Sequence, residues 1–466
     1  MKQAIRPLTY TLLALLGFSA LWLTWTETRA GADYRNDPRN IRAFEPPGDP
    51  SRGRVVTADG VVVAEDGPDG SRRYPEGAVY AHLVGFDSDG GRRGVERTRF
   101  GAMASRDDGS ITSWLLGLLG ADLGPPDVRL TIVDEVQQAA YDALGGRTGA
   151  VVALDPRTGA VIAYVSSPSF DPNDVVDGSL DPDDADAEEA LRDRVADRVL
   201  PPGSTFKVLV TAAAMRAGLD GDSEIQAGAS YTPPGGGMPI RNAGDGGCGG
   251  DLVTLTRALV VSCNTAFARL AVDLGAGRIV DIAEAAGFNR AIPWETGTVR
   301  SSIPSAAALQ SDPPALAQSG IGERDVRATP LLMALIAAAI ANDGVAMAPH
   351  VVDALVAPDG EVLHDTGTRF LHRLVPPGTA RDIAGMMIEV VVGGTGGPAS
   401  VPGVEIAAKT GTAEGSGGPH AWIIAFGPAG EPTIAVAVVV EGGGSGGQVA
   451  GPIARAVIEA WLGYGE

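Results

Sequence analysis

The sequence PPGSTFK occupies residues 201–207 and leads directly into an apolar segment, Val208 to Met215. If that segment is a helix, Ser204 lies in its first turn and Lys207 follows three residues later, so the hydroxyl and the amine share one face. A hydroxyl beside an amine can serve as a nucleophile with its base. The alternative is structural, because serine also favours the N-terminal cap of a helix and Lys207 would then be a surface lysine.

The scarcity of lysine gives this pair weight. Of the 36 cationic residues, only Lys2, Lys207 and Lys409 are lysines, and the rest are arginines. Arginine stays protonated at any accessible pH, whereas a desolvated lysine can lose its proton and act as a base. We therefore expect Lys207 to do something that arginine cannot, although the local sequence alone does not decide between the two interpretations.

Composition excludes several classes of function. The chain has 466 residues, 44% of them hydrophobic and 20% charged, which is enough for two or three globular domains. Its net charge of −21 argues against a nucleic-acid partner, because binding phosphates needs clustered cations. The two cysteines and five scattered histidines lack metal-ligand spacing, so no metal site is predicted. The scattered positions of the histidines also disfavour a Ser-His-Asp hydrolase.

The N-terminal stretch carries no charge from residue 7 to residue 26 and predicts a membrane anchor. At ~1.5 Å per residue, a helix of this length spans the ~30 Å hydrocarbon core. Lys2 and Arg6 precede it, so the N-terminus is expected in the cytoplasm and the chain after Ala30 outside the cell membrane. A cleaved signal peptide is the alternative, since residues 28–30 offer small residues at the right spacing. The apolar run exceeds the ~7 to 15 residues usual for such a peptide, which favours an uncleaved anchor.

We divide the chain into a cytoplasmic tip with the anchor (residues 1–28), a pedestal (residues 29–146) and a catalytic domain (residues 147–466). The pedestal is predicted to be an extended mixed module with short strands at 54–56 and 61–64 and a helix from Glu135 to Leu144. The acidic stretch from 171 to 197 is interpreted as a solvated loop or helix face without a ligand.

The catalytic domain is predicted to be an α+β fold. Residues 151–154 and 161–165 form a hairpin around a Pro- and Gly-containing turn, and residues 404–414, 420–426 and 433–441 form three further strands before a C-terminal helix at 449–462. Residues 252–286 and 330–341 have helical patterning. Two strands before the helices and three after them predict one antiparallel five-stranded sheet, interrupted by an inserted α-rich lobe.

Two further short motifs follow the first. Ser262-Cys263-Asn264 could line a cleft if it lies at an interhelix connection, although serine and asparagine are more often caps. Lys409-Thr410-Gly411-Thr412 ends a predicted strand and offers a cation, two hydroxyls and a glycine where backbone can approach a ligand. Each motif alone is weak evidence.

In the order SxxK, SxN, KTG, the three motifs resemble the set found in penicillin-binding proteins and β-lactamases. PPGSTFK, SCNTAF and KTGTAE are similar to the versions in class B penicillin-binding proteins, as are residues 315–342 and the pedestal segments at 52–56 and 94–96. The short pedestal, the segment 163–170 and the SCN motif are most similar to the actinobacterial penicillin-binding protein A group. Glu323 stands where a glutamine is expected and Leu200 where an aromatic is common, and we expect neither departure to affect the chemistry.

The resemblance implies the penicillin-binding transpeptidase and serine β-lactamase-like fold, and a role for each motif residue. Ser204 would attack the carbonyl of a D-Ala-D-Ala stem peptide, with Lys207 as the general base. Ser262 would relay the proton and Asn264 would hold the peptide. Lys409, Thr410 and Thr412 would bind the terminal carboxylate, beside Gly411. The backbone N–H groups of Ser204 and Thr412 would form the oxyanion hole, and no metal or organic cofactor is needed.

The cysteines lie close together in sequence and outside the predicted anchor. Cys263 is part of the second motif and Cys248 precedes it, so a disulfide between them is one interpretation and two buried free thiols the other.

Three functions remain to be compared. The first is a peptidoglycan D,D-transpeptidase that binds β-lactams covalently. The second is a D,D-carboxypeptidase or β-lactamase, in which water resolves the acyl-enzyme, although a β-lactamase needs neither an anchor nor a pedestal. The third is a non-catalytic β-lactam sensor or cell-wall scaffold, which the intact motif residues disfavour. The resemblance further implies a membrane-embedded glycan polymerase as partner.

Overall fold

The computed structural model describes residues 15–19, 22, 52–88, 90–103, 118, 124–184, 187–243, 247–415 and 417–464. Most of the predicted anchor lies outside these residues; those of it that are described, 15–19 and 22, are helical. Within the described ranges, no helix is both long and apolar enough to cross a bilayer. The anchor and the alternative signal peptide therefore stay predictions.

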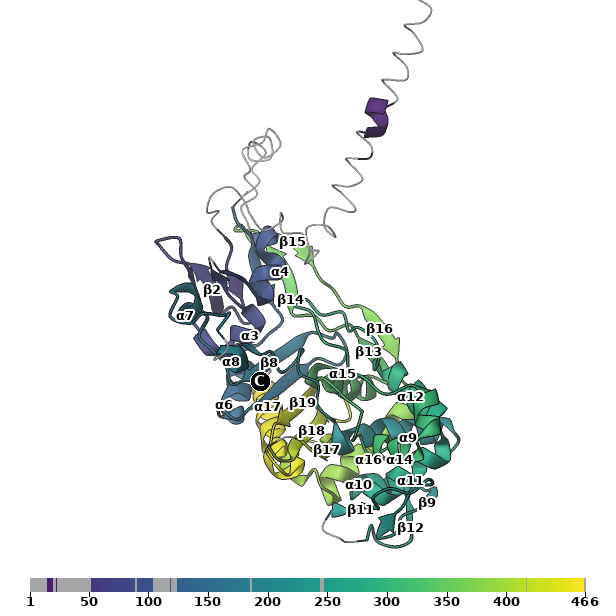
Figure 1. Cartoon of the computed structure of the whole chain (residues 1–466). Helices are drawn as coiled ribbons and strands as arrows, with labels where there is room; N and C mark the ends of the chain where they lie inside the picture. The colour runs from purple at the N-terminus through teal and green to yellow at the C-terminus, as the bar shows by residue number, and fades with distance from the viewer. Residues whose placement is uncertain are drawn as a thin grey trace, which may run out of the picture.

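The core of the molecule is a five-stranded antiparallel sheet in the order β17-β18-β19-β7-β8, as predicted (Figure 1). Its strands are β7 (Gly149–Leu154), β8 (Val161–Ser167), β17 (Ala407–Ala413), β18 (His420–Gly427) and β19 (Ile434–Val440). The central strands are continuous runs of Val, Ile and Ala rather than alternating patterns, because both faces of the sheet are covered.

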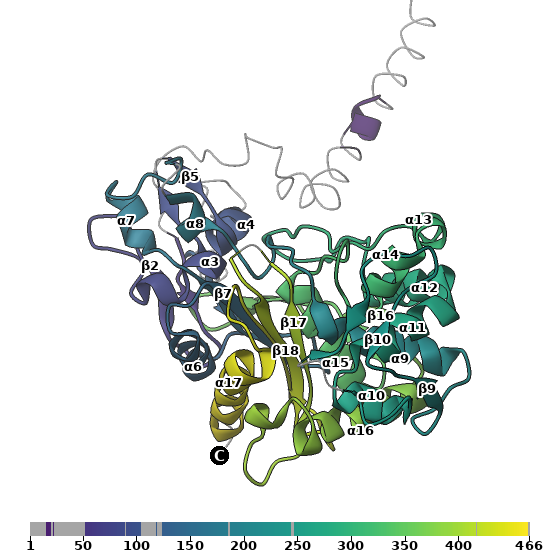
Figure 2. The same cartoon turned by 60° about the horizontal axis from the view of Figure 1, so that its bottom comes forward.

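Helices cover the two faces of this sheet. α6 (Asp134–Leu144) and α17 (Gly451–Tyr464) pack together on one face, where Val136, Leu144 and Val457 share a core with the strands (Figure 2). α15 (Pro330–Ala341) lies on the other face and is buried almost throughout, because the α-rich lobe covers its far side. The sheet therefore presents its β17 edge to the lobe.

The inserted lobe supplies the other wall of the site. It contains α9 (Lys207–Arg216), α10 (Leu255–Val260), α11 (Asn264–Leu274), α12 (Ala276–Ala286), α13 (Ala306–Ser311), α14 (Pro313–Ser319) and α16 (Pro377–Gly393). The helical pattern predicted over 252–286 is thus divided into three helices, and its first residues form the short strand β12 (Leu252–Thr254). Thr254 ends the strand and caps α10 by accepting the N–H of Arg257 at 3.1 Å.

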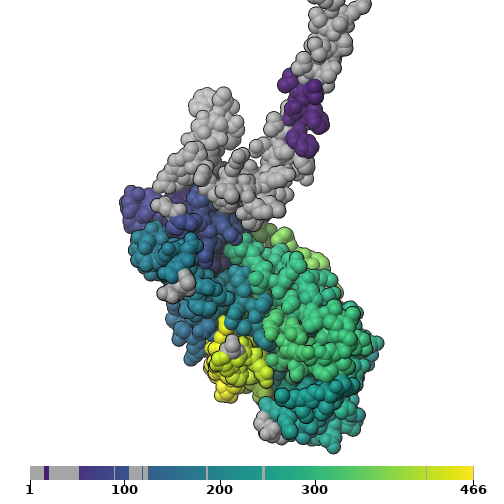
Figure 3. Space-filling view, viewed as in Figure 1, coloured from purple at the N-terminus to yellow at the C-terminus, as the bar shows by residue number. Residues whose placement is uncertain are grey.

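The pedestal forms a second sheet with strands from both halves of the chain. Its order is β15-β14-β6-β1-β2-β3, with β1 (Val55–Val56), β2 (Val62–Asp66), β3 (Arg72–Arg73), β6 (Asp127–Leu130), β14 (Val352–Val356) and β15 (Val362–Asp365). Figure 3 shows the pedestal in purple and blue at one end of the molecule and the teal part of the lobe at the other. The division at residue 146 stays a prediction, because α6 packs on the main sheet and β14 pairs with β6.

Ion pairs hold the pedestal together. Arg72 on β3 donates from Nε to Glu96 on α4 (Gly94–Met103) at 2.7 Å, and both side chains are buried, with 1% and 0% of their area exposed. Arg72 also pairs with Asp66 at 3.0 Å, and Arg52 pairs with Asp66 and Asp87. The two segments whose sequence resembles a class B pedestal, 52–56 and 94–96, supply Arg52 and Glu96 to these pairs.

We expect Glu96→Leu to lower the free energy of unfolding by about 3–5 kcal/mol, because it leaves the buried Arg72 without its main partner. Urea unfolding followed by circular dichroism measures the loss. The double variant Arg72→Met/Glu96→Leu should lose clearly less, since no charge is then left unpaired. Asp69→Ala is the matched control, because its pair with Arg73 is more than half exposed and its loss should leave the free energy of unfolding nearly unchanged. Equal losses for the single and double variants would contradict this account.

Candidate active site

The nucleophile turn, residues 202–206, joins the sheet to the lobe. Ser204 lies in a 3-10 turn, η5 (Gly203–Phe206), which leads into α9 at Lys207. The serine was expected in the first turn of the helix itself; the tighter turn leaves it half-buried, while Lys207 is fully buried. Gly203 has φ of 53°, a left-handed conformation that favours glycine, and its N–H donates to Gly322 O at 3.0 Å.

The nucleophile turn packs backbone to backbone against β17. A Cβ on Gly203 would lie 2.8 Å from Thr412 O, and a Cβ on Gly411 would lie 2.8 Å from Pro202 O. Both distances are too short for a side chain. The glycine of the third motif is thus explained by contact with the nucleophile turn, and the two elements that carry the N–H groups of Ser204 and Thr412 lie side by side.

The second motif lies at the connection between α10 and α11. This is the interhelix position that the motif would need in order to line a cleft. Ser262 has φ of 57°, unusual for a residue other than glycine, and this conformation turns its polar atoms toward the lysines. Lys207 Nζ donates to Ser262 O at 2.8 Å, to Ser262 Oγ at 3.2 Å and to Asn264 Oδ1 at 2.7 Å. Lys409 Nζ donates to the same Ser262 Oγ at 3.0 Å and to Thr410 O at 2.8 Å. The Ser262 hydroxyl therefore lies between the two amines.

Burial and mutual repulsion control the charge of the two lysines. Burial lowers the pKa of Lys207 well below its ordinary value, and the nearby positive charge of Lys409 lowers that pKa further. Burial alone lowers the pKa of Lys409 to about 7. Two ammonium groups on one hydroxyl in a dry site are unfavourable, so a neutral Lys207 amine is favoured. An amine in that state can accept a proton.

The hydroxyls of the third motif have separate surroundings. Thr410 Oγ1 shares a hydrogen bond of 2.5 Å with Thr395 Oγ1, and Thr412 is exposed and accepts the N–H of Gly446 at 3.3 Å. Thr395 and Gly446 were missed from the sequence, because each lies in a Gly-rich connection without a motif of its own. Within the described ranges, no group of three or more His, Cys, Asp or Glu residues is placed to hold a metal ion.

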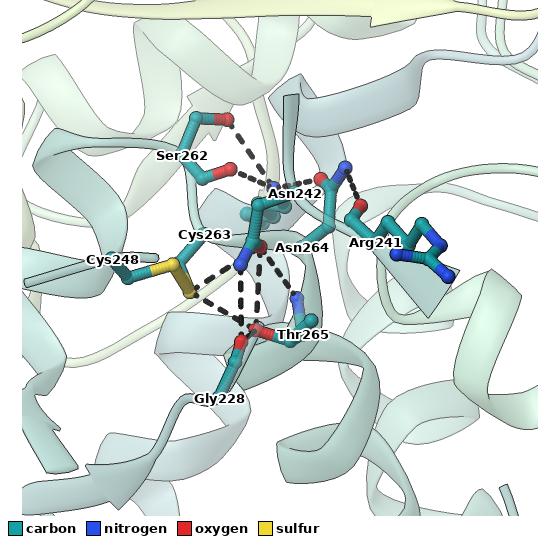
Figure 4. The surroundings of a disulfide bond; sticks show 9 residues. Gly228, Arg241, Asn242, Cys248, Ser262, Cys263, Asn264 and Thr265 are labelled. Carbon is teal, nitrogen blue, oxygen red and sulfur yellow. Dashed lines mark hydrogen bonds between the residues drawn. A yellow bond between two sulfur atoms is a disulfide. The ribbon is translucent and has the colours of Figure 1, made fainter. Parts of the chain in front are cut away.

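The structure joins Cys248 and Cys263 in a disulfide, so the alternative of two free thiols does not hold (Figure 4). Figure 4 shows Cys263 between Ser262 and Asn264, with Asn242 and Arg241 facing them. Asn264 Nδ2 donates to Arg241 O at 3.0 Å, and Asn242 Oδ1 accepts the N–H of Thr265 at 3.1 Å. The disulfide and these amide contacts anchor the connection that carries Ser262, and closing a loop of this length contributes about 3 kcal/mol in the chain-entropy model.

The fold and the arrangement of the three motifs define one class of protein, the penicillin-binding transpeptidases, and comparisons with known proteins agree. The family model "Penicillin binding protein transpeptidase domain" matches residues 149–459, so the chain belongs to that family. Within it, the chain is a class B penicillin-binding protein similar to PbpA of mycobacteria. It is 36% identical over 497 residues to peptidoglycan D,D-transpeptidase PbpA of Mycolicibacterium smegmatis, with 99% of each chain covered.

Solved structures give the same result. The ceftriaxone acyl-enzyme complex of penicillin-binding protein A from M. tuberculosis superimposes with a TM-score of 0.82 at 34% identity, covering 92% of this chain and 100% of that one. The penicillin G acyl-enzyme complex of the same protein has a TM-score of 0.80 at 36% identity, covering 89% of this chain and 100% of that one. The predicted penicillin-binding transpeptidase fold is confirmed.

Proposed function

We propose that this chain is a peptidoglycan D,D-transpeptidase in which Ser204 forms the acyl-enzyme. The Ser204 hydroxyl oxygen attacks the carbonyl carbon between the two D-alanines of a stem peptide, and its proton passes to the amine of Lys207. An ester forms on Ser204 as the peptide bond breaks and the last D-alanine leaves. The observation that carries this proposal is the Ser262 hydroxyl held between the buried amines of Lys207 and Lys409.

The leaving amine needs a proton, and the geometry supports a short route for it. Lys207 holds the proton taken from Ser204, and Ser262 Oγ lies 3.2 Å from Lys207 Nζ. Ser262 can therefore donate to the leaving nitrogen while it accepts from Lys207. Asn264 keeps Lys207 in place through its Oδ1 and is the proposed contact for the peptide backbone of the donor.

The N–H groups of Ser204 and Thr412 are proposed to form the oxyanion hole. Their support is the close packing of the nucleophile turn on β17, and such a donor is worth about 3 to 4 kcal/mol. Lys409, Thr410 and Thr412 are the proposed binding residues for the terminal carboxylate. β-Lactams would acylate the same serine, as the names of the solved M. tuberculosis complexes state for that protein.

In the second half-reaction an amine of another stem peptide attacks the ester carbon, forms the cross-link and returns a proton to the site as Ser204 is released. The similarity to proteins named D,D-transpeptidases over 99% of their length favours this outcome over attack by water. A D,D-carboxypeptidase or β-lactamase remains the alternative in which water attacks the same ester.

A fluorescent penicillin tests the assignment. The full chain in neutral detergent is labelled, digested and mapped by mass spectrometry, and the adduct is expected on the peptide that contains Ser204, with release slow enough for the adduct to be isolated. An adduct on another peptide would exclude Ser204 as the nucleophile, and rapid release of hydrolysed penicillin would favour the β-lactamase. Adding a stem peptide with a free acceptor amine should give a cross-linked product and free D-alanine.

We also propose that residues 7–26 anchor the protein in the cell membrane with the catalytic domain outside, and that a membrane glycan polymerase is its partner. The uncharged N-terminal stretch after Lys2 and Arg6 supports the first proposal. The mass of the mature protein from membranes tests it: retention of residues 1–30 is expected, and a chain beginning after Ala30 would favour the signal peptide. The polymerase proposal predicts that photo-crosslinkers placed in the pedestal capture an integral membrane protein, and capture of none would contradict it.

A further inference from the structure

Glu323 lies where the nucleophile turn meets β17. It follows α14, and its N–H donates to Gln318 O at 3.1 Å. The residue before it, Gly322, accepts the N–H of Gly203 at 3.0 Å. On its other side, Glu323 Oε1 accepts the N–H of Glu414, the residue that follows β17, at 3.2 Å. Glu323 thus contacts the end of β17 directly and the nucleophile turn through Gly322.

In the described part of the chain, the hydrogen-bond acceptors of Lys207 include no carboxylate. The three atoms that accept from Lys207 Nζ are uncharged, and the neighbouring ionisable group, Lys409, is a cation. Among the described residues, Glu323 is the acid whose negative charge acts on Lys207, and it raises the pKa of that lysine against the effect of burial. The expectation that this departure from the family pattern leaves the chemistry unaffected stays a prediction.

Glu323 itself can change its charge near neutral pH. Burial raises the pKa of Glu323 to about 7, and the neighbouring carboxylate of Glu414 raises it further, against the N–H of Glu414 and the charges of Arg327 and Lys207. The remaining charges on its loop are paired elsewhere, since Arg324 bonds to Asp312 at 2.8 Å and lies 3.4 Å from Asp325.

We propose that Glu323 is a positioning residue that supplies the counter-charge for Lys207 when this lysine takes the proton of Ser204. The inference rests on the proposed role of Lys207 as the base. In acylation one proton moves from Ser204 Oγ to Lys207 Nζ and then on to the leaving amine. Glu323 makes and breaks no covalent bond; its carboxylate stabilises the lysine cation between these two transfers.

A counter-charge has two effects of opposite sign. It stabilises the cation that forms during acylation, so its loss should lower the maximal acylation rate at alkaline pH. It also keeps resting Lys207 protonated up to higher pH. Its loss should therefore move the acid limb of the rate profile, which is the pH range over which the acylation rate rises, to lower pH. If Glu323 only held β17 and the nucleophile turn together, Glu323→Gln would not move the acid limb, because glutamine keeps an oxygen that can accept the N–H of Glu414.

The test is the rate of acylation by a fluorescent penicillin from acidic to alkaline pH, using the full chain in neutral detergent. For Glu323→Gln we expect an acid limb at lower pH and a maximal rate about three- to tenfold below native. Glu323→Asp keeps the charge and should keep the native limb. Asp325→Asn is the matched control, since it removes an exposed carboxylate of the same loop and should leave both quantities unchanged.

Glu414→Gln should shift the acid limb in the direction opposite to Glu323→Gln. It removes the neighbour that raises the pKa of Glu323, so Glu323 ionises at lower pH and the limb should move to higher pH. A limb in the native position in Glu323→Gln, or the same direction of shift in Glu323→Gln and Glu414→Gln, would overturn the inference. If the native chain forms no adduct on Ser204, the proposed function fails together with this inference. If the native chain forms the adduct but the variants do not shift the acid limb as expected, only the inference about Glu323 fails.

Discussion

Replacing Lys207 by methionine should lower the rate of acylation by penicillin by about 10²- to 10⁴-fold, the range that general base catalysis contributes. Methionine has similar length and suits a buried site, but it cannot accept the proton of Ser204. The acid limb of the rate profile should disappear with it, because in the native chain acylation rises as the pH passes upward through the lowered pKa of Lys207. Stopped-flow fluorescence with a labelled penicillin measures both effects.

Lys207→Arg is the informative companion. It keeps a cation and hydrogen-bond donors toward Ser262 and Asn264, but arginine stays protonated, so it should be about as inactive as methionine. A thermal unfolding temperature near native would show that either variant is folded. Acylation of Lys207→Met within tenfold of the native rate would exclude Lys207 as the base.

Gly203→Ala should lower acylation by about 10²- to 10³-fold, the effect of losing an oxyanion-hole donor. The added methyl group would lie 2.8 Å from Thr412 O and 3.1 Å from Ala413 Cβ, so the nucleophile turn and β17 must move apart. This separation displaces the N–H groups of Ser204 and Thr412 from each other. The measurement is again the acylation rate, together with the thermal unfolding temperature.

Gly218→Ala is the control that separates the steric clash in Gly203→Ala from the backbone strain of placing alanine at a positive φ. Gly218 follows α9 and also has a positive φ, 98°, but a Cβ there would meet no atom within 4 Å. If both variants acylate at the native rate, the close contact between the nucleophile turn and β17 is not needed for the chemistry.

The sequence predicted the main sheet and the meeting of the three motifs, because both depend on local patterns. Val151 to Leu154 and the later valine-rich runs are short and rich in β-branched residues, which favours buried strands, and the order of Ser204, Ser262 and Lys409 is distinctive. The left-handed backbone of Ser262 could not be predicted, since serine rarely adopts a positive φ and no local pattern indicates one there. The contact of Glu323 with Glu414 depends on how the loop after α14 meets β17, and no local pattern encodes such a meeting.

The pairing of β14 with β6 has a consequence for how the protein could be shortened or recombined. These strands come from opposite halves of the chain and share backbone hydrogen bonds from Val352 to Val356. A fragment beginning at residue 147 would keep β14 and β15 but lose their neighbour, leaving an open strand edge that invites aggregation. We expect such a fragment to be soluble only when residues 52–146, which also supply α6, are co-expressed. Exchange of pedestals between relatives would then have to carry residues 352–365 along, so a gene crossover at the apparent boundary should be selected against.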